Sequence, residues 1–352
     1  MTRIRKVAIV YHYFAHYRQP ILDQLSSSQS FHYLLASDDC NPSGIKALGP
    51  EYFDSLKGTS LSWTKLKNIW FNPLLWQRGV FKLSWSSQIE AVIFLGDAFF
   101  VSTWAAAILA RLTGKKVFFW THGLYGRESF WKRLYRLSFY RIANGGLLLY
   151  GNHAKQLLEK SGFDSNKLIN VFNSLDHDRQ LSLRKTLDQK IAIETKNKLF
   201  GQHADLPTMV FIGRLTKEKE LNLLVELLVH FHAETKPVNL LLVGDGQEKE
   251  PLESSIPDDL REHVCFYGAC YEEEEIATLI HASEVCVSPG NIGLTAIHSL
   301  TYGTPVVTHG TKQWQGPEFE AIEEGTNGSL FQKGDFHSLK RSVEKWLSLI
   351  HI

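Results

Sequence analysis

The segment of this sequence with the strongest chemical signal is residues 287–298, where an apolar run meets a glycine-containing loop and then a helix-like stretch. Gly290 and Gly293 allow the backbone to approach a ligand closely. A helix that begins near Leu294 presents unpaired N–H groups to an anion, and Thr295 adds a hydroxyl in its first turn. Taken alone, the pattern is equally typical of an ordinary turn between a strand and a helix.

Two cations follow another predicted strand. Arg214 comes just after the apolar run 209–212, and Lys219 stands five positions further along. Arginine holds two phosphate oxygens at once through its planar donor fork, and lysine adds a point charge. Combined with the loop of residues 287–298, the two cations favour a diphosphate site. The alternative for each is a solvated surface charge.

Short apolar runs alternate with helix-like segments along the chain, which predicts parallel sheets covered by helices on both faces. A chain of 352 residues exceeds what one core usually supports, so we expect two doubly wound α/β domains. We place the boundary after Asp176, giving domains 1–176 and 177–335, and expect a final helix over 336–352 to cross back onto the first domain. Residues 38–90, interrupted by prolines, receive no assignment. The predicted strands cover residues 6–11, 31–36, 91–95, 117–121 and 146–150, and then 209–212, 240–243, 264–267, 284–288 and 305–308.

The overall net charge of +1 conceals an asymmetry. Residues 1–176 carry 21 Lys and Arg against 11 Asp and Glu, whereas residues 177–352 carry 17 against 26. The basic half has no nucleic-acid-binding motif, so we expect no nucleic-acid partner and favour an anionic membrane surface. The segment 130–142 interleaves aromatic with basic residues, as membrane-interface helices do, although a core-packing helix with a basic face gives the same pattern. The longest apolar window, 99–110, is too short to span a bilayer, and with no leader segment in view we expect a cytoplasmic location, peripheral on the membrane.

Motifs in the second half resemble those of the group 1 glycosyltransferases, which are retaining enzymes of the GT-B fold. The resemblance covers about residues 205–335 and is looser in the first half, around Trp120-Thr121-His122-Gly123 and 171–176. It implies two Rossmann-like domains that face each other across a cleft, and transfer of a hexose from a nucleoside diphosphate sugar. The motifs that carry it are Gly213-Arg214-Leu215, Leu242-Val243-Gly244-Asp245-Gly246, Phe266-Tyr267-Gly268 and the block 287–307.

The same resemblance assigns roles to residues. His122 would contact the donor hexose, while Arg214 and Lys219 bind the diphosphate, and these three form the implied catalytic group. The acceptor would be a glycan or a lipid-linked saccharide in cell-surface polysaccharide biosynthesis, and a UDP-sugar is slightly favoured over a GDP-sugar as donor. No other cofactor is implied. The donor-binding set is Gly213, Arg214, Lys219, Gly244, Tyr267, Gly290, Asn291, Ile292, Gly293, Leu294, Thr295, His298 and Glu318.

The chain departs from the family at two positions. Members usually carry two glutamates eight positions apart around this loop, where this sequence has Gly290 and His298. A histidine can still hydrogen-bond a ribose hydroxyl through either ring nitrogen. The departure leaves open a nucleotide-sugar-binding protein without catalysis, or a sugar-nucleotide epimerase on the same fold. Glu318 and Glu320 both remain candidates for the family's Pro-Glu position.

Polar residues in the strand–helix loops of the first half are candidates for acceptor binding. Asp97 could equally cap a helix, and His122 could be a structural histidine. The expected acceptor set is His16, Tyr17, Arg18, Asp97, Tyr125 and Arg127.

We expect no metal site. Asp176-His177-Asp178 matches a metal-chelating pattern of another glycosyltransferase fold, but its place before a polar helix favours a helix N-cap. The four cysteines include no CxxC pair, which excludes a disulfide framework and argues against a zinc site.

Overall fold

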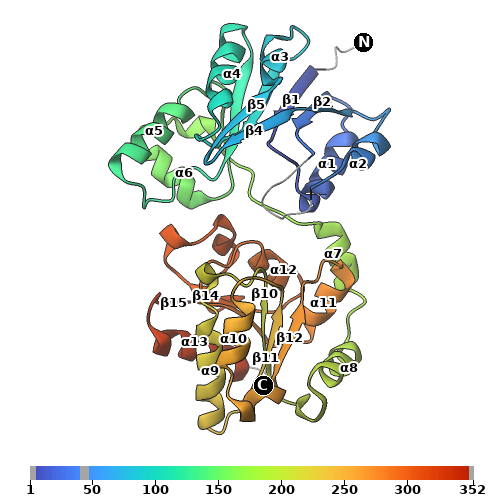
Figure 1. The fold of residues 1–352 in the computed structure, drawn as a ribbon, viewed down its shortest axis with the longest axis vertical. Coiled ribbons are helices and arrows are strands. Elements are labelled where there is room, and N and C mark those ends of the chain that lie inside the picture. The colour runs from blue at the N-terminus through green and yellow to red at the C-terminus, as the bar shows by residue number, and fades with distance from the viewer. Residues whose placement is uncertain (1–4, 40–46, 349–352) are drawn as a thin grey trace. The chain divides into compact units, whose positions relative to one another are not determined.

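The computed structural model describes residues 5–39 and 47–348 and divides at Phe172 and Asn173 into two units. The division falls four residues before the boundary that we placed after Asp176. Cys40, one of the four cysteines, and residues 349–352 of the expected final helix lie outside the described residues. Both units are doubly wound α/β structures, as expected (Figure 1).

The N-terminal unit contains a seven-stranded parallel sheet in the order β3-β2-β1-β6-β7-β8-β9. The strand β1 (Arg5–Val10) pairs with β2 on one side and β6 on the other, so the order of the strands reverses there. The predicted strands are confirmed to within a residue or two, whereas β3 and β9 have no counterpart in the prediction. The remaining strands of this sheet are β2 (Phe31–Ser37), β3 (Leu61–Lys65), β6 (Ala91–Leu95), β7 (Lys116–Thr121), β8 (Gly146–Leu149) and β9 (Leu168–Asn170).

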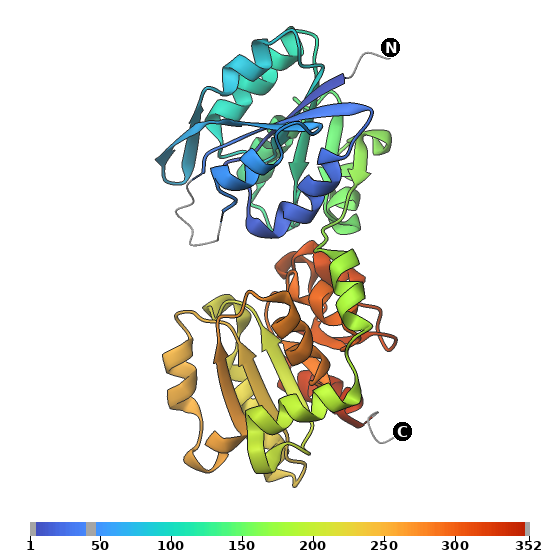
Figure 2. The same cartoon turned by 90° about the vertical axis from the view of Figure 1, so that its right-hand side faces the viewer.

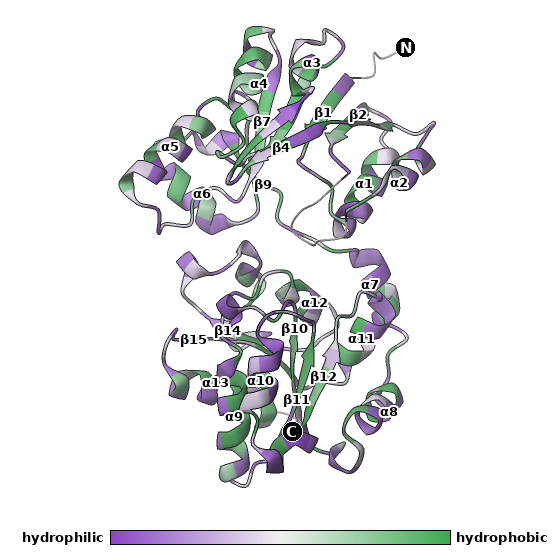
Figure 3. Ribbon diagram, in the orientation of Figure 1, coloured by the Kyte–Doolittle hydropathy of each residue, from purple (hydrophilic) through white to green (hydrophobic). Residues whose placement is uncertain are grey.

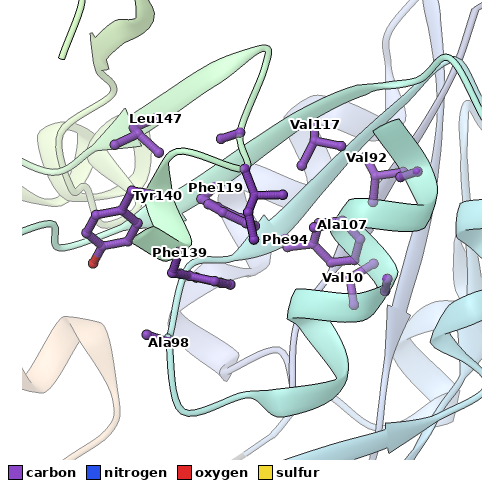
Figure 4. Packing of buried hydrophobic residues seen from close by; sticks show 14 of the residues in the cluster. Val10, Val92, Phe94, Ala98, Ala107, Val117, Phe119, Phe139, Tyr140 and Leu147 are labelled. Carbon is purple, nitrogen blue, oxygen red and sulfur yellow. The ribbon is translucent and has the colours of Figure 1, made fainter. Parts of the chain in front are cut away.

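Helices cover both faces of this sheet (Figures 1 and 2). On one face, α4 (Val101–Leu112) and α5 (Phe130–Tyr140) pack over β6 and β7, where Phe94, Phe119 and Phe139 are fully buried (Figure 4). On the other face lie α1 (Gln19–Ser26) and α2 (Pro50–Ser55). The N-terminal unit also contains α3 (Val80–Trp85) and α6 (Asn152–Glu159).

A two-stranded antiparallel hairpin, β4 (Lys67–Phe71) and β5 (Leu74–Arg78), stands outside the main sheet. It lies in the segment that received no assignment from the sequence. Burial alternates along β5, but the exposed Leu74 and Trp76 are apolar and the buried Gln77 is polar, so the hydropathy of the sequence does not show the alternation. Leu75 on β5 forms a backbone hydrogen bond to the carbonyl of Phe99, which ties the hairpin to the loop before α4.

The C-terminal unit has a six-stranded parallel sheet in the order β12-β11-β10-β13-β14-β15. Its strands are strongly hydrophobic (Figure 3), because helices bury them on both faces. The strand β10 (Thr208–Ile212) stands between β11 and β13, where the strand order reverses. The other strands are β11 (Asn239–Val243), β12 (Val264–Gly268), β13 (Val285–Ser288), β14 (Val306–His309) and β15 (Gly328–Phe331).

Two sets of helices enclose this sheet. One side carries α9 (Asn222–Ala233), α10 (Lys249–Ser255) and α13 (Phe336–Ser348), and the other carries α8 (Gln189–Phe200), α11 (Glu273–His281) and α12 (Thr295–Thr301). The polar helix α7 (His177–Arg184) leads into the unit, and the Asp176 carboxylate accepts a hydrogen bond from the Arg179 amide, as the N-cap interpretation predicted.

The final helix differs from the prediction. We expected residues 336–352 to cross back to the first domain, but α13 packs on β13, β14 and β15 of its own unit. Leu339, Val343 and Leu347 form its buried stripe and belong to the core that also contains Val285. An apolar stripe on a helix shows that one face is buried, but it does not specify which surface covers that face.

Within the described residues, every helix is too short or too polar to serve as a transmembrane segment.

Candidate functional site

The N-terminal unit contains a cavity of about 280 Å³ at the carboxyl ends of β1, β6, β7 and β8. In doubly wound sheets this edge, at the point where the strand order reverses, is where ligands bind. The lining is dominated by aromatic and cationic side chains. It includes Tyr11, His12, Tyr13, Tyr17, Arg18, Asp97, Thr121, His122, Tyr125, Arg136, Tyr140 and Tyr150.

Most of the predicted acceptor residues lie in this lining, together with His122, which the sequence analysis assigned to the donor hexose. His16 and Arg127 are not among the lining residues, although the Arg127 guanidinium lies 5.5 Å from the centre of the Tyr125 ring. Sequence reasoning missed Tyr150, which directly follows β8 and could have been found by the strand-end argument applied to His122. It also missed Tyr140, for which the sequence holds no local signal because a helix brings it to the cavity.

Aromatic rings surround the guanidinium of Arg18. Its Cζ lies 5.0 Å from the Trp120 ring centre and 5.2 Å from that of Tyr11, with the rings of Tyr17 and Tyr150 at 5.9 and 5.8 Å. The Nη2 atom donates a hydrogen bond of 2.6 Å to the Tyr150 hydroxyl. These contacts fix the direction of the guanidinium at the cavity wall.

Both histidines of the cavity favour their neutral form. Desolvation, with a contribution from the Arg18 charge, lowers the pKa of His12 to about 4. Desolvation and the charges of Arg18 and Arg136 lower the pKa of His122 to about 4. The ring of His122 lies 4.5 Å from that of Tyr150 and is open to the cavity, so at neutral pH it can offer both a donor and an acceptor nitrogen to a ligand.

The loop after β7 is fixed by a charge pair. The Glu128 carboxylate accepts hydrogen bonds from the backbone amides of Tyr125 and Gly126. Arg136 on α5 donates to Glu128, at 3.3 Å, and to the carbonyl of Gly123. Burial works against the charge on Glu128, but the two amides and Arg136 keep its pKa below the usual value. These contacts position His122 and Tyr125 at the edge of the cavity.

Asp97 does not form the helix cap that we had weighed against a ligand role, because no side chain caps the N-terminus of α4. Its Oδ1 accepts a hydrogen bond of 2.9 Å from the amide of Phe99, which closes the turn before α4. The carboxylate also lines the cavity. A role of Asp97 in ligand binding therefore stays a prediction.

In the C-terminal unit, the loop after β13 packs against the loop after β10. The amide of Gly290 donates to the carbonyl of Lys219 at 3.0 Å, and the Lys219 ammonium donates to the carbonyl of Asn291. A Cβ at position 290 would lie 2.1 Å from the carbonyl oxygen of Glu218. The family's glutamate therefore does not fit at this position while the two loops keep this contact.

Gln315 is a component of this loop that the sequence did not reveal. It is buried, and its amide group donates to the Thr308 hydroxyl at 2.9 Å and to the carbonyl of His309 at 3.0 Å. Its Oε1 accepts from the amide of Ile292 at 3.1 Å. We had assigned that amide to the donor phosphate, and this hydrogen bond shows instead that it is already used within the loop.

The two predicted phosphate-binding cations differ in their surroundings. Arg214 is exposed, and among residues 5–39 and 47–348 no acidic side chain forms an ion pair with it. Lys219 is half-buried, and burial outweighs the nearby Glu218 and Glu318 carboxylates, so its pKa is lowered. Glu318 is buried and accepts a hydrogen bond of 2.8 Å from Asn173. Of the two candidate glutamates, it is therefore Glu318 whose charge acts on Lys219.

Glycines allow the strand ends beside this loop to approach each other. A Cβ at Gly244 would lie 1.9 Å from the carbonyl oxygen of Gly213, and both residues have positive φ angles. The hydroxyl of Thr295 donates to the carbonyl of Ile212 at 2.7 Å, so its proton is used to join α12 to β10. Leu294 and Gly293 immediately precede α12, as predicted.

His298 has a carboxylate partner that sequence reasoning did not connect with it. Its Nε2 lies 3.2 Å from Oε2 of Glu273, a residue of the acidic run that begins α11. Burial opposes the charge on Glu273, but hydrogen bonds from His298, Tyr302 and Gln180 bring its pKa down to about 2. In the tautomer in which Nε2–H donates to this carboxylate, Nδ1 is left as an acceptor.

The remaining predicted donor residue, Tyr267, ends β12 and donates its hydroxyl to Glu275. This contact raises the pKa of Tyr267 to about 12. In the part of the chain that the structure describes, no three His, Cys, Asp or Glu side chains converge as a metal-binding group.

Two doubly wound units, each with polar residues at the edge where its strand order reverses, define the GT-B class of fold. The second unit adds two cations and a glycine-rich loop suited to a phosphorylated ligand.

Comparison with known proteins shows a family that part of this chain resembles. Residues 193–349 match the sequence model described as "Glycosyl transferases group 1". The C-terminal unit of the chain is therefore similar to the group 1 glycosyl transferases.

Two curated relatives agree with this assignment. A glycogen synthase of Rhodopirellula baltica is 26% identical over 188 residues, which are 47% of this chain and 36% of that protein. A GDP-mannose-dependent alpha-mannosyltransferase of Corynebacterium glutamicum is 29% identical over 171 residues, covering 48% of this chain and 35% of that protein. This chain therefore spans little more than a third of the length of these two relatives.

Solved structures match over almost the whole chain. Anabaena Alr3699/HepE in complex with UDP has a TM-score of 0.68 at 14% identity, covering 98% of this chain and 90% of that one. The same protein in complex with UDP-glucose gives a TM-score of 0.67 at 15% identity. At such identity the likeness establishes the fold of both units.

Proposed function

We propose that this chain is a retaining glycosyltransferase that moves a hexose from a nucleoside diphosphate sugar to a glycan or lipid-linked saccharide in cell-surface polysaccharide biosynthesis. The observation that carries the proposal is the pair of cations in the C-terminal unit. Lys219 is held against the glycine-containing loop at Asn291, and Arg214 is exposed at the end of the neighbouring strand β10. Such an arrangement suits a diphosphate.

In the proposed reaction, the acceptor hydroxyl attacks the anomeric carbon as the bond from that carbon to the diphosphate oxygen breaks. Arg214 and Lys219 stabilise the negative charge that develops on the leaving diphosphate. The hydroxyl proton passes to the departing phosphate on the same face of the sugar, so the reaction requires neither a metal ion nor a protein base. His122 orients the hexose as a neutral hydrogen-bonding group.

The preferred donor is a UDP-sugar, and no further cofactor takes part. Support comes from the structures of HepE with UDP and UDP-glucose, proteins of the same fold. His298 supports a nucleoside ligand, because its pairing with Glu273 leaves an acceptor nitrogen for a ribose hydroxyl.

A panel of UDP- and GDP-sugars tests this proposal with purified protein. Binding is measured by calorimetry with the free diphosphates, and turnover is measured as release of UDP or GDP with and without saccharide acceptors. We expect binding and acceptor-dependent release for one donor. Binding with no release under any condition would favour a catalytically inactive nucleotide-sugar-binding protein. Conversion of the donor to an epimer would favour an epimerase, and absence of all binding would contradict the proposal.

We further propose that the protein works at the cytoplasmic face of an anionic membrane. The helix α5 supports this location because Phe130 and Trp131 are 71% and 75% exposed, beside the exposed Lys132. Exposed aromatic residues next to basic ones are typical of segments that bind the headgroup region of anionic lipids.

A further inference from the structure

The cavity of the N-terminal unit holds a guanidinium group without a carboxylate partner. Among residues 5–39 and 47–348, no aspartate or glutamate forms an ion pair with Arg18, whose described hydrogen bond goes to the Tyr150 hydroxyl. The segments outside that description, 1–4, 40–46 and 349–352, contain no aspartate or glutamate. Among the described residues, the charge of Arg18 is therefore balanced by ring faces and phenol oxygens.

The surrounding aromatic rings hold the guanidinium of Arg18 in one orientation. Rings of Tyr11, Tyr17, Trp120 and Tyr150 lie 5.0–5.9 Å from the guanidinium carbon. These rings replace part of the water that would otherwise hydrate the guanidinium. They accept hydrogen bonds from few of its five N–H groups. Because this cation is already partly desolvated and ordered, an anionic ligand that binds it incurs less of the cost of desolvation and ordering.

The other charges of the cavity are already used. Arg136 pairs with Glu128 at 3.3 Å and also donates to a backbone carbonyl. The single acidic residue of the lining, Asp97, has one carboxylate oxygen engaged by the amide of Phe99. Among the described lining residues, Arg18 is therefore the cation whose charge is not compensated by an ion pair.

The hydroxyl of Tyr150 extends the site. It accepts a hydrogen bond from Arg18, so its own proton remains for a further acceptor, with the Tyr11 hydroxyl 3.5 Å away. A phenol polarised by a charged donor is a stronger donor itself. Arg18 and Tyr150 together can thus offer several donors to one group with more than one oxygen.

We propose that this cavity binds an anionic group of the acceptor, a phosphate or a carboxylate, with Arg18 as its counter-charge. The inference rests on the proposed function, in which this unit binds the acceptor. It narrows the acceptor to a saccharide that carries a negative charge close to the reacting hydroxyl. The charge comes either from a lipid phosphate or from an acidic sugar, and the two sources share the same chemistry at Arg18.

Calorimetry with charged and neutral probes tests the inference, with saturating UDP present to occupy the anion site of the other unit. Octyl phosphate is compared with octyl glucoside, and glucuronate with glucose. We expect at least one charged probe to bind the wild-type protein ten times more tightly than its neutral counterpart. The charged probe that binds more tightly identifies the source. Equal binding of charged and neutral probes in both pairs would overturn the inference.

Variants connect that preference to Arg18. Arg18→Gln should abolish the preference for the charged probe, and Arg18→Lys should retain part of it. The matched control is Arg141→Gln, which removes a guanidinium 5.5 Å from the Phe163 ring but outside the cavity lining, and it should keep the full preference. An unchanged preference in Arg18→Gln would overturn the inference. Should that variant fail to fold, a salt-independent affinity of the wild type for the charged probe would overturn the inference.

The two proposals fail in different ways. Wild-type protein that binds UDP but does not prefer charged probes contradicts only the anionic acceptor. Wild-type protein that binds neither UDP nor GDP contradicts the proposed function itself.

Discussion

Replacing Gly290 by alanine tests whether close contact between two loops shapes the donor site. A Cβ at this position would lie 2.1 Å from the carbonyl oxygen of Glu218 and 2.8 Å from the backbone carbons of Lys219. Because non-bonded carbon and oxygen atoms prefer separations of about 3.5 Å, the loop of residues 217–219 has to move by roughly 1 Å or more. The clash is with backbone, so no side chain can rotate away to relieve it.

That displacement carries two expected costs. Overpacking of this kind lowers the free energy of unfolding by about 1–3 kcal/mol. The hydrogen bond between the Lys219 ammonium and the Asn291 carbonyl would also be disturbed, and a charged hydrogen bond contributes about 1.5–3 kcal/mol. If the ammonium no longer faces the diphosphate, UDP should bind roughly 10- to 150-fold more weakly, since each ~1.4 kcal/mol changes an equilibrium constant tenfold.

Urea denaturation and calorimetry with UDP measure the two effects separately. Gly310→Ala is the matched control, because it also follows a strand of the same sheet and its Cβ would meet Leu330 at an ordinary 3.4 Å. We expect the control to behave like the wild type. We also expect Gly290→Glu to lose affinity, although it restores the residue that the family usually carries. Wild-type stability and UDP affinity in Gly290→Ala would show that the loops separate without cost, and the reasoning would be refuted.

Four further predictions concern charge and protonation. Lys219→Ala should weaken UDP binding by roughly tenfold or more in calorimetry, through loss of a charged hydrogen bond, and unchanged affinity would remove the basis of the donor site. His298→Ala should lower UDP affinity by about 2- to 10-fold, since it removes one neutral hydrogen bond to the ribose, and a silent variant would mean that this ring only packs. Burial lowers the pKa of His309 to about 4, so the unfolded chain takes up a proton before the folded one as pH falls below about 6.5. The wild type should therefore lose about 1.3 kcal/mol more than His309→Gln between pH 7.5 and 5.5 in urea denaturation, and parallel losses would contradict this. Trp131→Ser with Lys132→Glu should reduce sedimentation with anionic vesicles at low salt, while equal binding of the wild type to neutral vesicles would exclude an electrostatic membrane site.

Much of the fold could be predicted from the sequence. The alternation of apolar runs with amphipathic segments requires parallel sheets with two covered faces, because each run has to bury both of its sides. The strands on either side of each reversal of strand order, β1, β6, β10 and β13, were all predicted. The positions that follow strands, such as His122 and Arg214, were also found, since strand ends can be located from the apolar pattern alone.

The segment between β2 and β6 could not be predicted. Its hairpin strands β4 and β5 and its helices α2 and α3 are too short to show a clear period. The destination of α13 was predicted wrongly for a different reason. Its apolar stripe indicates that one face of the helix is buried. The surface that covers this face, on β13, β14 and β15, is formed by distant parts of the chain, so the stripe does not identify it.

For the candidate sites, the sequence likewise determined some properties and the tertiary structure others. The sequence alone determined which residue types stand at the strand ends, including the pair Arg214 and Lys219 and the histidine at position 298. Only the tertiary structure decided what those groups contact: Glu273 for His298, Gln315 for the amide of Ile292, and, for Arg18, four aromatic rings and no carboxylate among the described residues. The physical reason is that electrostatic and hydrogen-bond energies depend on distances of a few ångströms between residues far apart in the chain, and folding alone sets those distances.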